Sequence, residues 1–194
     1  YRYEILNILG NGTYGSVVES KDHKIKDKVA VKIFKNFDKN RPNYYEKEVK
    51  ILKFLKENDK GSITNILENF DFRNHNFIVT TLYYKNIYDD RYRIYKSNID
   101  DKLVIIKDIF TALAYLRSRR PKIIHGDLKP ENILFKNIKD YNIVLCDFGL
   151  SEFLNRDYIS KKQLIQSRYY RSPEIIYNVS FNEKIDIWSA GTII

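Results

Sequence analysis

The chain has 194 residues, of which 43% are hydrophobic and 14% aromatic, so it can form one or two domains with a sizeable core and is too apolar for a disordered tail. Its 34 basic and 25 acidic residues give a net charge of +9 without a run of five basic residues, and no apolar run approaches the ~18 residues of a membrane span, so we expect no specific nucleic-acid partner and no membrane insertion. The single Cys146 excludes an intrachain disulfide and, in a lysine-rich chain without a visible signal peptide, favours the cytoplasm or the nucleus.

Residues 1–37 alternate apolar and polar positions between turn signals, which predicts antiparallel strands. Between two of these strands lies the segment 10–17, with the sequence G-N-G-T-Y-G-S-V. A lone G-x-G-x-x-G pattern is weak, because it also opens dinucleotide-binding folds, where a helix follows it. Here a short β-branched segment follows Gly15, so we predict a hairpin whose glycines let the backbone close over phosphates.

The next segments continue this lobe with a strand and a helix. The strand 29–32 ends in Lys32, a residue that in a strand usually just faces solvent. From about residue 44 to 58 the apolar positions follow helical spacing with a charged opposite face. On that helix Glu48 lies next to the apolar stripe, whereas Glu46 lies far round the helix and is predicted to be a solvated charge.

Two longer apolar segments follow. Residues 77–83 read as a buried strand running into a linker. Residues from about 99 to 120 predict a long amphipathic helix, capped by Asn98 or Asp100. Its predicted apolar face consists of Leu103, Ile106, Ile109, Phe110, Leu113 and Leu116.

Residues 123–132 concentrate chemically useful side chains. An apolar pair at 123–124 should lie in the core, and Pro130 stops a regular helix, so that Asp127, Lys129 and Asn132 project from a shaped loop. A carboxylate and an ammonium two residues apart can face one reacting centre, and an amide oxygen is a hard neutral ligand suited to magnesium. Taken alone, the Asp-Lys pair would more simply be a solvated surface ion pair.

The segments 133–135 and 143–145 read as paired short strands that end at Asp147, in the sequence D-F-G. As a bare tripeptide, D-F-G would be an ordinary turn at the end of a strand. Further on, residues 186–191 read D-I-W-S-A-G, in which Trp188 is also predicted to pack in the core.

Taken together, these motifs resemble those of eukaryotic protein kinases. The resemblance rests on H-G-D-L-K-P-E-N at 125–132, D-F-G fifteen residues after Asn132, the glycine loop with V-A-V-K after it, and D-x-W-S-x-G. The segments N-I-Y-D at 86–89 and Q-S-R-Y-Y-R-S-P-E at 166–174 are similar to the CMGC group, closest to the dual-specificity tyrosine-regulated and homeodomain-interacting kinase families. Those families usually carry Phe and Glu where this chain has Thr80 and Thr81.

The resemblance implies an α+β, bilobal protein-kinase fold. An antiparallel-sheet N-lobe, residues 1–82, would bind ATP in the cleft that it forms with a helical C-lobe. Residues 83–194 would be a C-lobe truncated after the catalytic loop, the activation segment and the start of the central helix. The chain also lacks Met, so Tyr1 is not expected to be a native start.

The resemblance further implies a protein kinase that transfers the γ-phosphoryl group of ATP, with Mg²⁺, to protein substrates. Lys129, two residues after Asp127, is typical of serine/threonine kinases, and tyrosine autophosphorylation is left open. The alternative is a catalytically weak or inactive pseudokinase that binds nucleotide or acts as a scaffold. The oligomeric state cannot be derived from the sequence, and a monomer is favoured.

The resemblance also assigns roles to individual residues. Asp127 would be the catalytic base and Lys129 would neutralise charge on the moving group. Lys32, held by Glu48, would bind the phosphates. The magnesium ligands would be Asn132 and Asp147. The predicted nucleotide-binding residues are Gly10, Asn11, Gly12, Thr13, Gly15, Val17, Ala30, Lys32, Thr81, Tyr83 and Leu134.

Three further residues are assigned by position in these motifs. Ser167 would place its hydroxyl near Lys129, and Asp186 would accept hydrogen bonds from the backbone of the catalytic loop. Gly126 departs from most regulated kinases, which have at this place an arginine that binds a phosphate on the activation segment. We therefore expect the activation segment to be ordered without such a phosphate.

Overall fold

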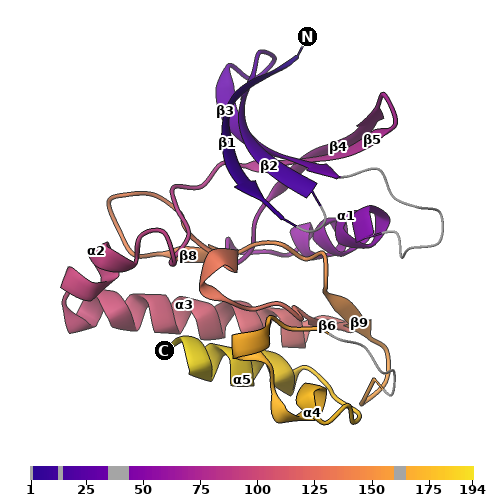
Figure 1. Ribbon diagram of the computed structural model, residues 1–194, viewed down its shortest axis with the longest axis vertical. Helices are drawn as coiled ribbons and strands as arrows, with labels where there is room; N and C mark the ends of the chain where they lie inside the picture. The colour runs from indigo at the N-terminus through magenta and orange to yellow at the C-terminus, as the bar shows by residue number, and fades with distance from the viewer. Residues whose placement is uncertain (1, 13–14, 35–43, 160–164) are drawn as a thin grey trace. The chain divides into compact units, whose positions relative to one another are not determined.

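A computed structural model describes residues 2–12, 15–34, 44–159 and 165–194. The chain divides into two compact units (Figure 1), the first formed by Tyr1–Glu57 and Thr64–Tyr83 and the second by Asn58–Ile63 and Tyr84–Ile194. The short segment before Thr64 belongs to the second unit because Ile63 bridges Leu145 there. The boundary between the units thus lies between Tyr83 and Tyr84, except that the earlier segment Asn58–Ile63 also belongs to the second unit.

The first unit is built on one antiparallel sheet. Its strands lie in the order β1-β2-β3-β5-β4, and every neighbouring pair is antiparallel. The bounds are β1 Tyr3–Asn11, β2 Gly15–Asp22, β3 Asp27–Phe34, β4 Ile66–Phe72 and β5 His75–Thr81. Within the described residues, the antiparallel strands predicted for residues 1–37 and the strand predicted at 77–83 are confirmed.

The core of this sheet follows from the two-residue period of its strands. Val29 and Val31 of β3 are buried together with Val18 of β2 and Val79 of β5. Helix α1 (Tyr44–Lys56) covers part of the unit and buries the apolar stripe predicted from its helical spacing. Burial of such apolar side chains is the main favourable contribution to the stability of the sheet and helix.

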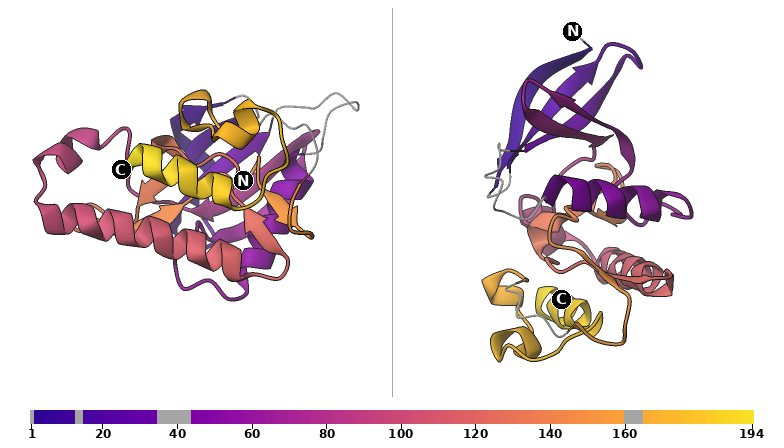
Figure 2. Two further views of the ribbon diagram at one scale, coloured as in Figure 1. Left: turned by 90° about the horizontal axis from the view of Figure 1, so that it is seen from below. Right: turned by 90° about the vertical axis from the view of Figure 1, so that its right-hand side faces the viewer.

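The second unit combines short strands with helices. The strands form two antiparallel pairs, β6 with β9 and β7 with β8, the latter as predicted. The bounds are α2 Arg91–Lys96, α3 Ile99–Ser118, β6 Lys122–Ile124, β7 Ile133–Phe135, β8 Ile143–Leu145, β9 Glu152–Leu154, α4 Pro173–Ile176 and α5 Lys184–Ile193, with single 3₁₀ turns η1 at Pro130–Asn132 and η2 at Arg168–Tyr170. The left view of Figure 2 shows α5 running beside α3. The predicted α+β class is confirmed.

Helix α3 begins where the sequence predicts but buries a narrower face. The side chain of Asn98 accepts a 2.8 Å hydrogen bond from the backbone N–H of Asp101, so Asn98 is the cap. The predicted burial of Leu103 and Phe110 is wrong: they are 51% and 39% exposed. The residues that the helix buries are Ile105, Ile109, Ala112, Leu113 and Leu116. Most of these repeat at steps of three or four residues, so one stripe of the helix faces the core, and Leu103 and Phe110 lie outside that stripe.

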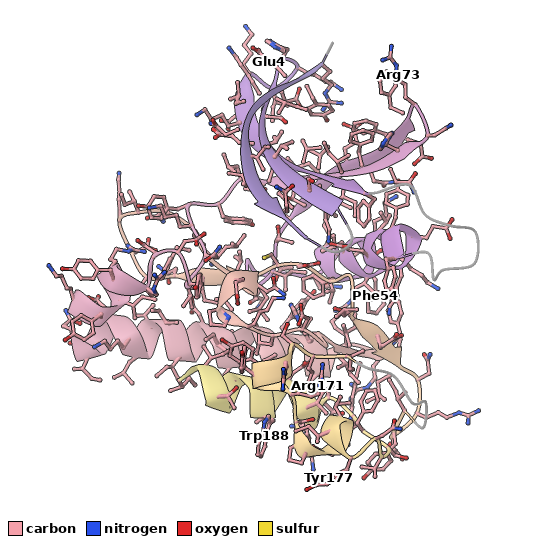
Figure 3. All side chains as sticks on the ribbon, viewed as in Figure 1. Glu4, Phe54, Arg73, Arg171, Tyr177 and Trp188 are labelled. Carbon is pink, nitrogen blue, oxygen red and sulfur yellow. The ribbon has the colours of Figure 1, made fainter. Side chains whose placement is uncertain are left out.

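Helix α5 does not bury its tryptophan. Trp188 of α5 is 48% exposed and points away from the ribbon of the second unit in Figure 3, so its predicted place in the core is wrong. Helix α5 instead turns Ile185, Ser189 and Ala190 inward. Within the described ranges, the helices lack the combined length and apolar character that a membrane span needs.

Candidate active site

The glycine loop is the hairpin that joins β1 and β2. Its turn is closed by a 2.8 Å hydrogen bond from the N–H of Gly12 to the carbonyl oxygen of Gly15, and the Ser16 hydroxyl donates to Asn11 at 2.7 Å. A Cβ atom on Gly15 would lie 2.2 Å from the carbonyl oxygen of Ile33, so the close approach of β3 admits only glycine there. Thr13, another predicted contact of the nucleotide, lies outside the described residues.

Strand register brings several predicted nucleotide contacts onto one face of the sheet. Val17 stands directly opposite Lys32 in the β2–β3 pair, and Gly10 stands opposite Val17 in the β1–β2 pair. Ala30 lies two residues before Lys32 and therefore points to the same face. This face is only partly buried, whereas Val29 and Val31 on the other face are in the core.

Lys32 of β3 and Glu48 of α1 form an ion pair, with Nζ 2.7 Å from Oε2. The side chains are 15% and 4% exposed, so the pair is held away from most of the solvent and fixes the lysine rotamer. Glu46, two residues earlier on α1, is exposed. The predicted choice of Glu48 over Glu46 as the partner of Lys32 agrees with this geometry.

The other predicted nucleotide contacts lie further along the chain. The backbone N–H of Thr81 donates to the carbonyl of Asn65 at 3.1 Å, so only its carbonyl remains a candidate for an adenine edge. Tyr83 follows the end of β5, where its hydroxyl accepts a 3.4 Å bond from the N–H of Asn65. In the second unit, Leu134 lies on β7 opposite Val144.

The loop that carries Asp127 is anchored from below by α5. Asp186 is 2% exposed and accepts hydrogen bonds from the N–H groups of His125 at 2.7 Å and Gly126 at 3.0 Å, as predicted. The ring of His125 adds two further anchors, because Nδ1 accepts from the N–H of Asp127 at 3.2 Å and Nε2 lies 3.0 Å from the carbonyl oxygen of Cys146. This pattern fixes the tautomer with the proton on Nε2. The backbone before the Asp127 carboxylate is thus held by buried hydrogen bonds.

Asp127, Lys129 and Ser167 form a closed triangle. The Ser167 hydroxyl donates to Oδ1 of Asp127 at 2.7 Å, and the Lys129 ammonium lies 2.9 Å from Oδ2 of Asp127 and 3.2 Å from the Ser167 hydroxyl. Asp127 is 7% exposed, so this is no solvated surface ion pair. A carboxylate, an ammonium and a hydroxyl therefore meet within hydrogen-bond distance of one another.

The electrostatics of the triangle keep Lys129 charged. Partial burial would lower the pKa of Lys129, but the hydrogen bond and charge of Asp127, helped by the charges of Asp147 and Glu131, outweigh burial and raise it. The ammonium therefore persists throughout the neutral range and can neutralise negative charge that develops beside it.

Asn132 and Asp147 are the candidate magnesium ligands of the second unit. The Asn132 amide nitrogen donates to the backbone carbonyl of Asp127 at 2.8 Å and to its Oδ2 at 3.2 Å, so the amide oxygen is the atom of this side chain that could bind a cation. Asp147 has a left-handed φ of +61°, and it directly follows the buried strand β8 and Cys146. In the described part of the chain no three His, Cys, Asp or Glu side chains cluster as a metal site. Magnesium that binds through one or two protein oxygens, with waters and substrate phosphates as its other ligands, fits this small donor set.

Comparison with known proteins shows to which protein family the chain belongs. Residues 3–194 match the protein kinase domain family. The chain belongs to that family. The resemblance stated from the catalytic loop, the glycine loop and D-F-G is thereby confirmed.

Curated relatives narrow the assignment within the protein kinase domain family. The chain is 42% identical to "Probable serine/threonine-protein kinase dyrk2" of Dictyostelium discoideum, 41% to "Serine/threonine-protein kinase ppk5" of Schizosaccharomyces pombe and 38% to human "Dual specificity tyrosine-phosphorylation-regulated kinase 3". Each match covers 100% of this chain but only 21%, 23% and 33% of the respective relative. The chain thus spans between about a fifth and a third of their length. The predicted similarity to the dual-specificity tyrosine-regulated kinases is confirmed.

In this kinase domain Gly126 has a structural reason to be glycine. Its φ is +77°, and a Cβ atom there would lie 2.7 Å from the carbonyl oxygen of Leu150. An arginine would be strained at this position as the backbone stands. The carbonyl of Gly126 instead accepts a 2.7 Å hydrogen bond from the N–H of Gln166, so an uncharged backbone contact joins the loop to the activation segment. That no phosphate is needed stays a prediction, and residues 160–164 lie outside the described ranges.

Sequence reasoning missed the part that Gln166 plays in this kinase domain. Gln166 is 3% exposed, has a φ of +65°, and makes hydrogen bonds through its backbone and its side chain. In the sequence, Gln166 stands out only as the first residue of the motif Q-S-R-Y-Y-R-S-P-E. The sequence carries no local signal of this role, because the neighbours of Gln166 in the chain are mostly polar and its partners on α5 lie about twenty positions away.

Proposed function

We propose that the protein is a serine/threonine kinase that transfers the γ-phosphoryl group of ATP to hydroxyl groups of protein substrates. The observation that carries the proposal is the triangle of Asp127, Lys129 and Ser167, in which a carboxylate is oriented by a hydroxyl and by a cation. Family membership supports the reaction class, and two relatives named as serine/threonine-protein kinases support serine or threonine as the residue that receives the phosphate.

Asp127 is proposed to orient the substrate hydroxyl and to take its proton. The carboxylate is held by Ser167 on one oxygen and by Lys129 and Asn132 on the other, so its direction is set before substrate arrives. Such preorganisation lowers the barrier because no reorganisation is needed during reaction. The Lys129 ammonium then neutralises charge on the group in transfer.

The phosphates and the metal are proposed to depend on four residues. Lys32, fixed by Glu48, would hold the α- and β-phosphates, since phosphates need charge-assisted hydrogen bonds to stay bound. The amide oxygen of Asn132 and the carboxylate of Asp147 would hold Mg²⁺. When bound, magnesium would offset the negative charge of the phosphates. The glycine-loop residues would supply backbone contacts to the same phosphates.

The alternative, a pseudokinase scaffold, has no observation in its favour. Lys32, Asp127 and Asp147, whose loss would be expected in such a protein, are all present. A monomer, a cytoplasmic or nuclear location, the absence of a specific nucleic-acid partner and tyrosine autophosphorylation remain predictions. The substrates are proposed to be proteins, without further definition.

A phosphotransfer assay with radiolabelled ATP tests the proposal. The complete protein is incubated with generic basic and acidic proteins, and the product is hydrolysed for phosphoamino-acid analysis. We expect label on serine or threonine, and loss of transfer when magnesium is chelated and its return when magnesium is restored. Label on no substrate under any metal condition would refute the proposed activity.

A further inference from the structure

Gln166 has a hydrogen-bond partner for each of its polar groups, and the partners come from three segments of the chain: the catalytic loop, residues 171–172 and α5. Its N–H donates to the Gly126 carbonyl at 2.7 Å, and its own carbonyl accepts from Nη2 of Arg171 at 3.0 Å and from Nε at 3.3 Å. The side-chain oxygen accepts from the N–H of Ser172 at 2.9 Å. The side-chain nitrogen donates to the Ile185 carbonyl at 2.8 Å and to the Ser189 hydroxyl at 2.7 Å.

These partners connect the catalytic loop to α5 along a second route. The first route is Asp186, which binds the N–H groups of His125 and Gly126. Gln166 binds the same helix through Ile185 and Ser189, one turn of α5, and binds the loop through the carbonyl of Gly126. Both routes are buried, so water cannot replace the bonds without opening the packing.

The residue after Gln166 belongs to the catalytic triangle. Ser167 donates to Oδ1 of Asp127, and no residue separates it from Gln166, so the place of the hydroxyl depends on how the Gln166 backbone is held. That backbone has a φ of +65°, which non-glycine residues seldom adopt without surrounding support. The side-chain amide supplies the support by fixing Gln166 to α5 and to Ser172.

We propose that Gln166 is a positioning residue of the catalytic site: its buried amide holds the backbone in the left-handed conformation that delivers the Ser167 hydroxyl to Asp127. This inference rests on the proposed kinase activity but concerns a residue outside the reacting groups. Gln166 touches neither reacting atom. Its effect on the carboxylate passes through Ser167.

The test compares Gln166→Met with wild type in the complete protein. Methionine keeps the unbranched shape and removes every side-chain hydrogen bond of the amide. We expect kcat to fall by at least about tenfold, because a misplacement of about 1 Å in a catalytic group can cost about 100-fold. The KM for ATP should stay within about twofold, since the assigned phosphate-holding residues Lys32 and Glu48 form their pair within the other unit. Thr192→Val is the control, because among the described residues the Thr192 hydroxyl donates only to the Ser189 carbonyl of the same helix.

A double-mutant cycle separates positioning from general damage. If Gln166 acts through Ser167, then Gln166→Met in a Ser167→Ala background should lower kcat by no more than about twofold further. The proposal would be overturned if the loss in kcat of the double variant equalled the product of the two single losses. A wild-type kcat in Gln166→Met alone would also overturn it.

Hydrogen exchange provides a measurement that needs no activity. Gln166→Met should speed exchange of the amides of Gln166 and Ser172 and of the loop 125–129, while Thr192→Val leaves them protected. If wild type transferred no phosphate, the proposed function would fail and exchange alone would decide the role of Gln166. Unchanged protection in Gln166→Met would then overturn it.

Discussion

Ser167 donates a 2.7 Å hydrogen bond to Oδ1 of Asp127 although forty positions separate the two residues in the chain. The bond requires that the activation segment returns to the catalytic loop with its backbone in place. It therefore links the order of one segment to the orientation of the proposed base in another.

Ser167→Ala should lower kcat with little change in the KM for ATP. A hydrogen bond to a charged group contributes about 1.5–3 kcal/mol, which corresponds to a loss of roughly 10- to 100-fold if the bond is needed in the transition state. Steady-state kinetics measure the effect, and Ser167→Thr, which keeps the hydroxyl, is the control. A wild-type kcat for the alanine variant would show that the hydroxyl does not orient Asp127.

Glu48→Gln should weaken the use of ATP, because it removes the carboxylate that holds Lys32. Breaking a buried ion pair costs about 3–5 kcal/mol, so kcat/KM for ATP should fall by roughly 100-fold or more. Glu46→Gln changes the same residue type on an exposed position of α1 and should be close to neutral. Equal losses for the two variants, measured in the same assay, would contradict the assignment of Glu48.

Gly126→Ala should destabilise the second unit and reduce activity. The left-handed φ of +77° costs an alanine about 1–2 kcal/mol, and the 2.7 Å approach of Cβ to the Leu150 carbonyl adds to this cost. Gly191→Ala is a matched control, because no atom of the described residues lies within 4 Å of its added Cβ and alanine favours the helix α5. Denaturation followed by the fluorescence of Trp188 reports on this unit. A Gly126→Ala protein as stable as Gly191→Ala would refute the steric argument.

Asp22 should make the first unit sensitive to acid. The hydrogen bonds from Arg2, at 3.0 Å and 2.8 Å, hold the pKa of this buried carboxyl below its usual range despite the opposing effect of burial. A carboxyl whose pKa is lowered by folding stabilises the folded state at pH values above its ordinary pKa of about 3.9. This contribution to stability is lost as the pH falls through the pKa of the folded state.

Asp22→Asn should therefore lower the free energy of unfolding at pH 7. The difference from wild type should become progressively smaller as the pH falls into the acid range. Urea titrations followed by the NMR intensities of β1 and β2 amides measure the difference from wild type. Asp27→Asn, at an exposed position on the β2–β3 hairpin, is the control and should show no such trend. A difference for Asp22→Asn that stayed constant from pH 7 to acid pH would contradict the role of its charge.

Local spacing predicted much of this structure. The two-residue period gave the strands of the first unit, helical spacing chose Glu48 over Glu46, and the fixed separations within H-G-D-L-K-P-E-N placed Asp127, Lys129 and Asn132 in one loop. These features depend on neighbours within a few residues, so the sequence pattern carries them directly.

The failures concern contacts between distant segments. The exposure of Phe110 and Trp188 depends on which face of α3 and α5 meets the rest of the unit, and an apolar pattern alone does not say how wide the buried stripe is. Gln166 was missed because its left-handed backbone and its bonds to α5 arise only when segments about twenty residues apart are brought together.

The most direct test of the whole account is the kcat of Asp127→Asn beside its affinity for ATP. The amide keeps the shape of the side chain but cannot act as a carboxylate base, whose contribution is typically about 100- to 10,000-fold. We predict a loss of at least about 100-fold in kcat, with ATP and Mg²⁺ bound within about threefold of wild-type affinity. Transfer by Asp127→Asn at the wild-type rate would contradict the central claim that this carboxylate carries the reaction.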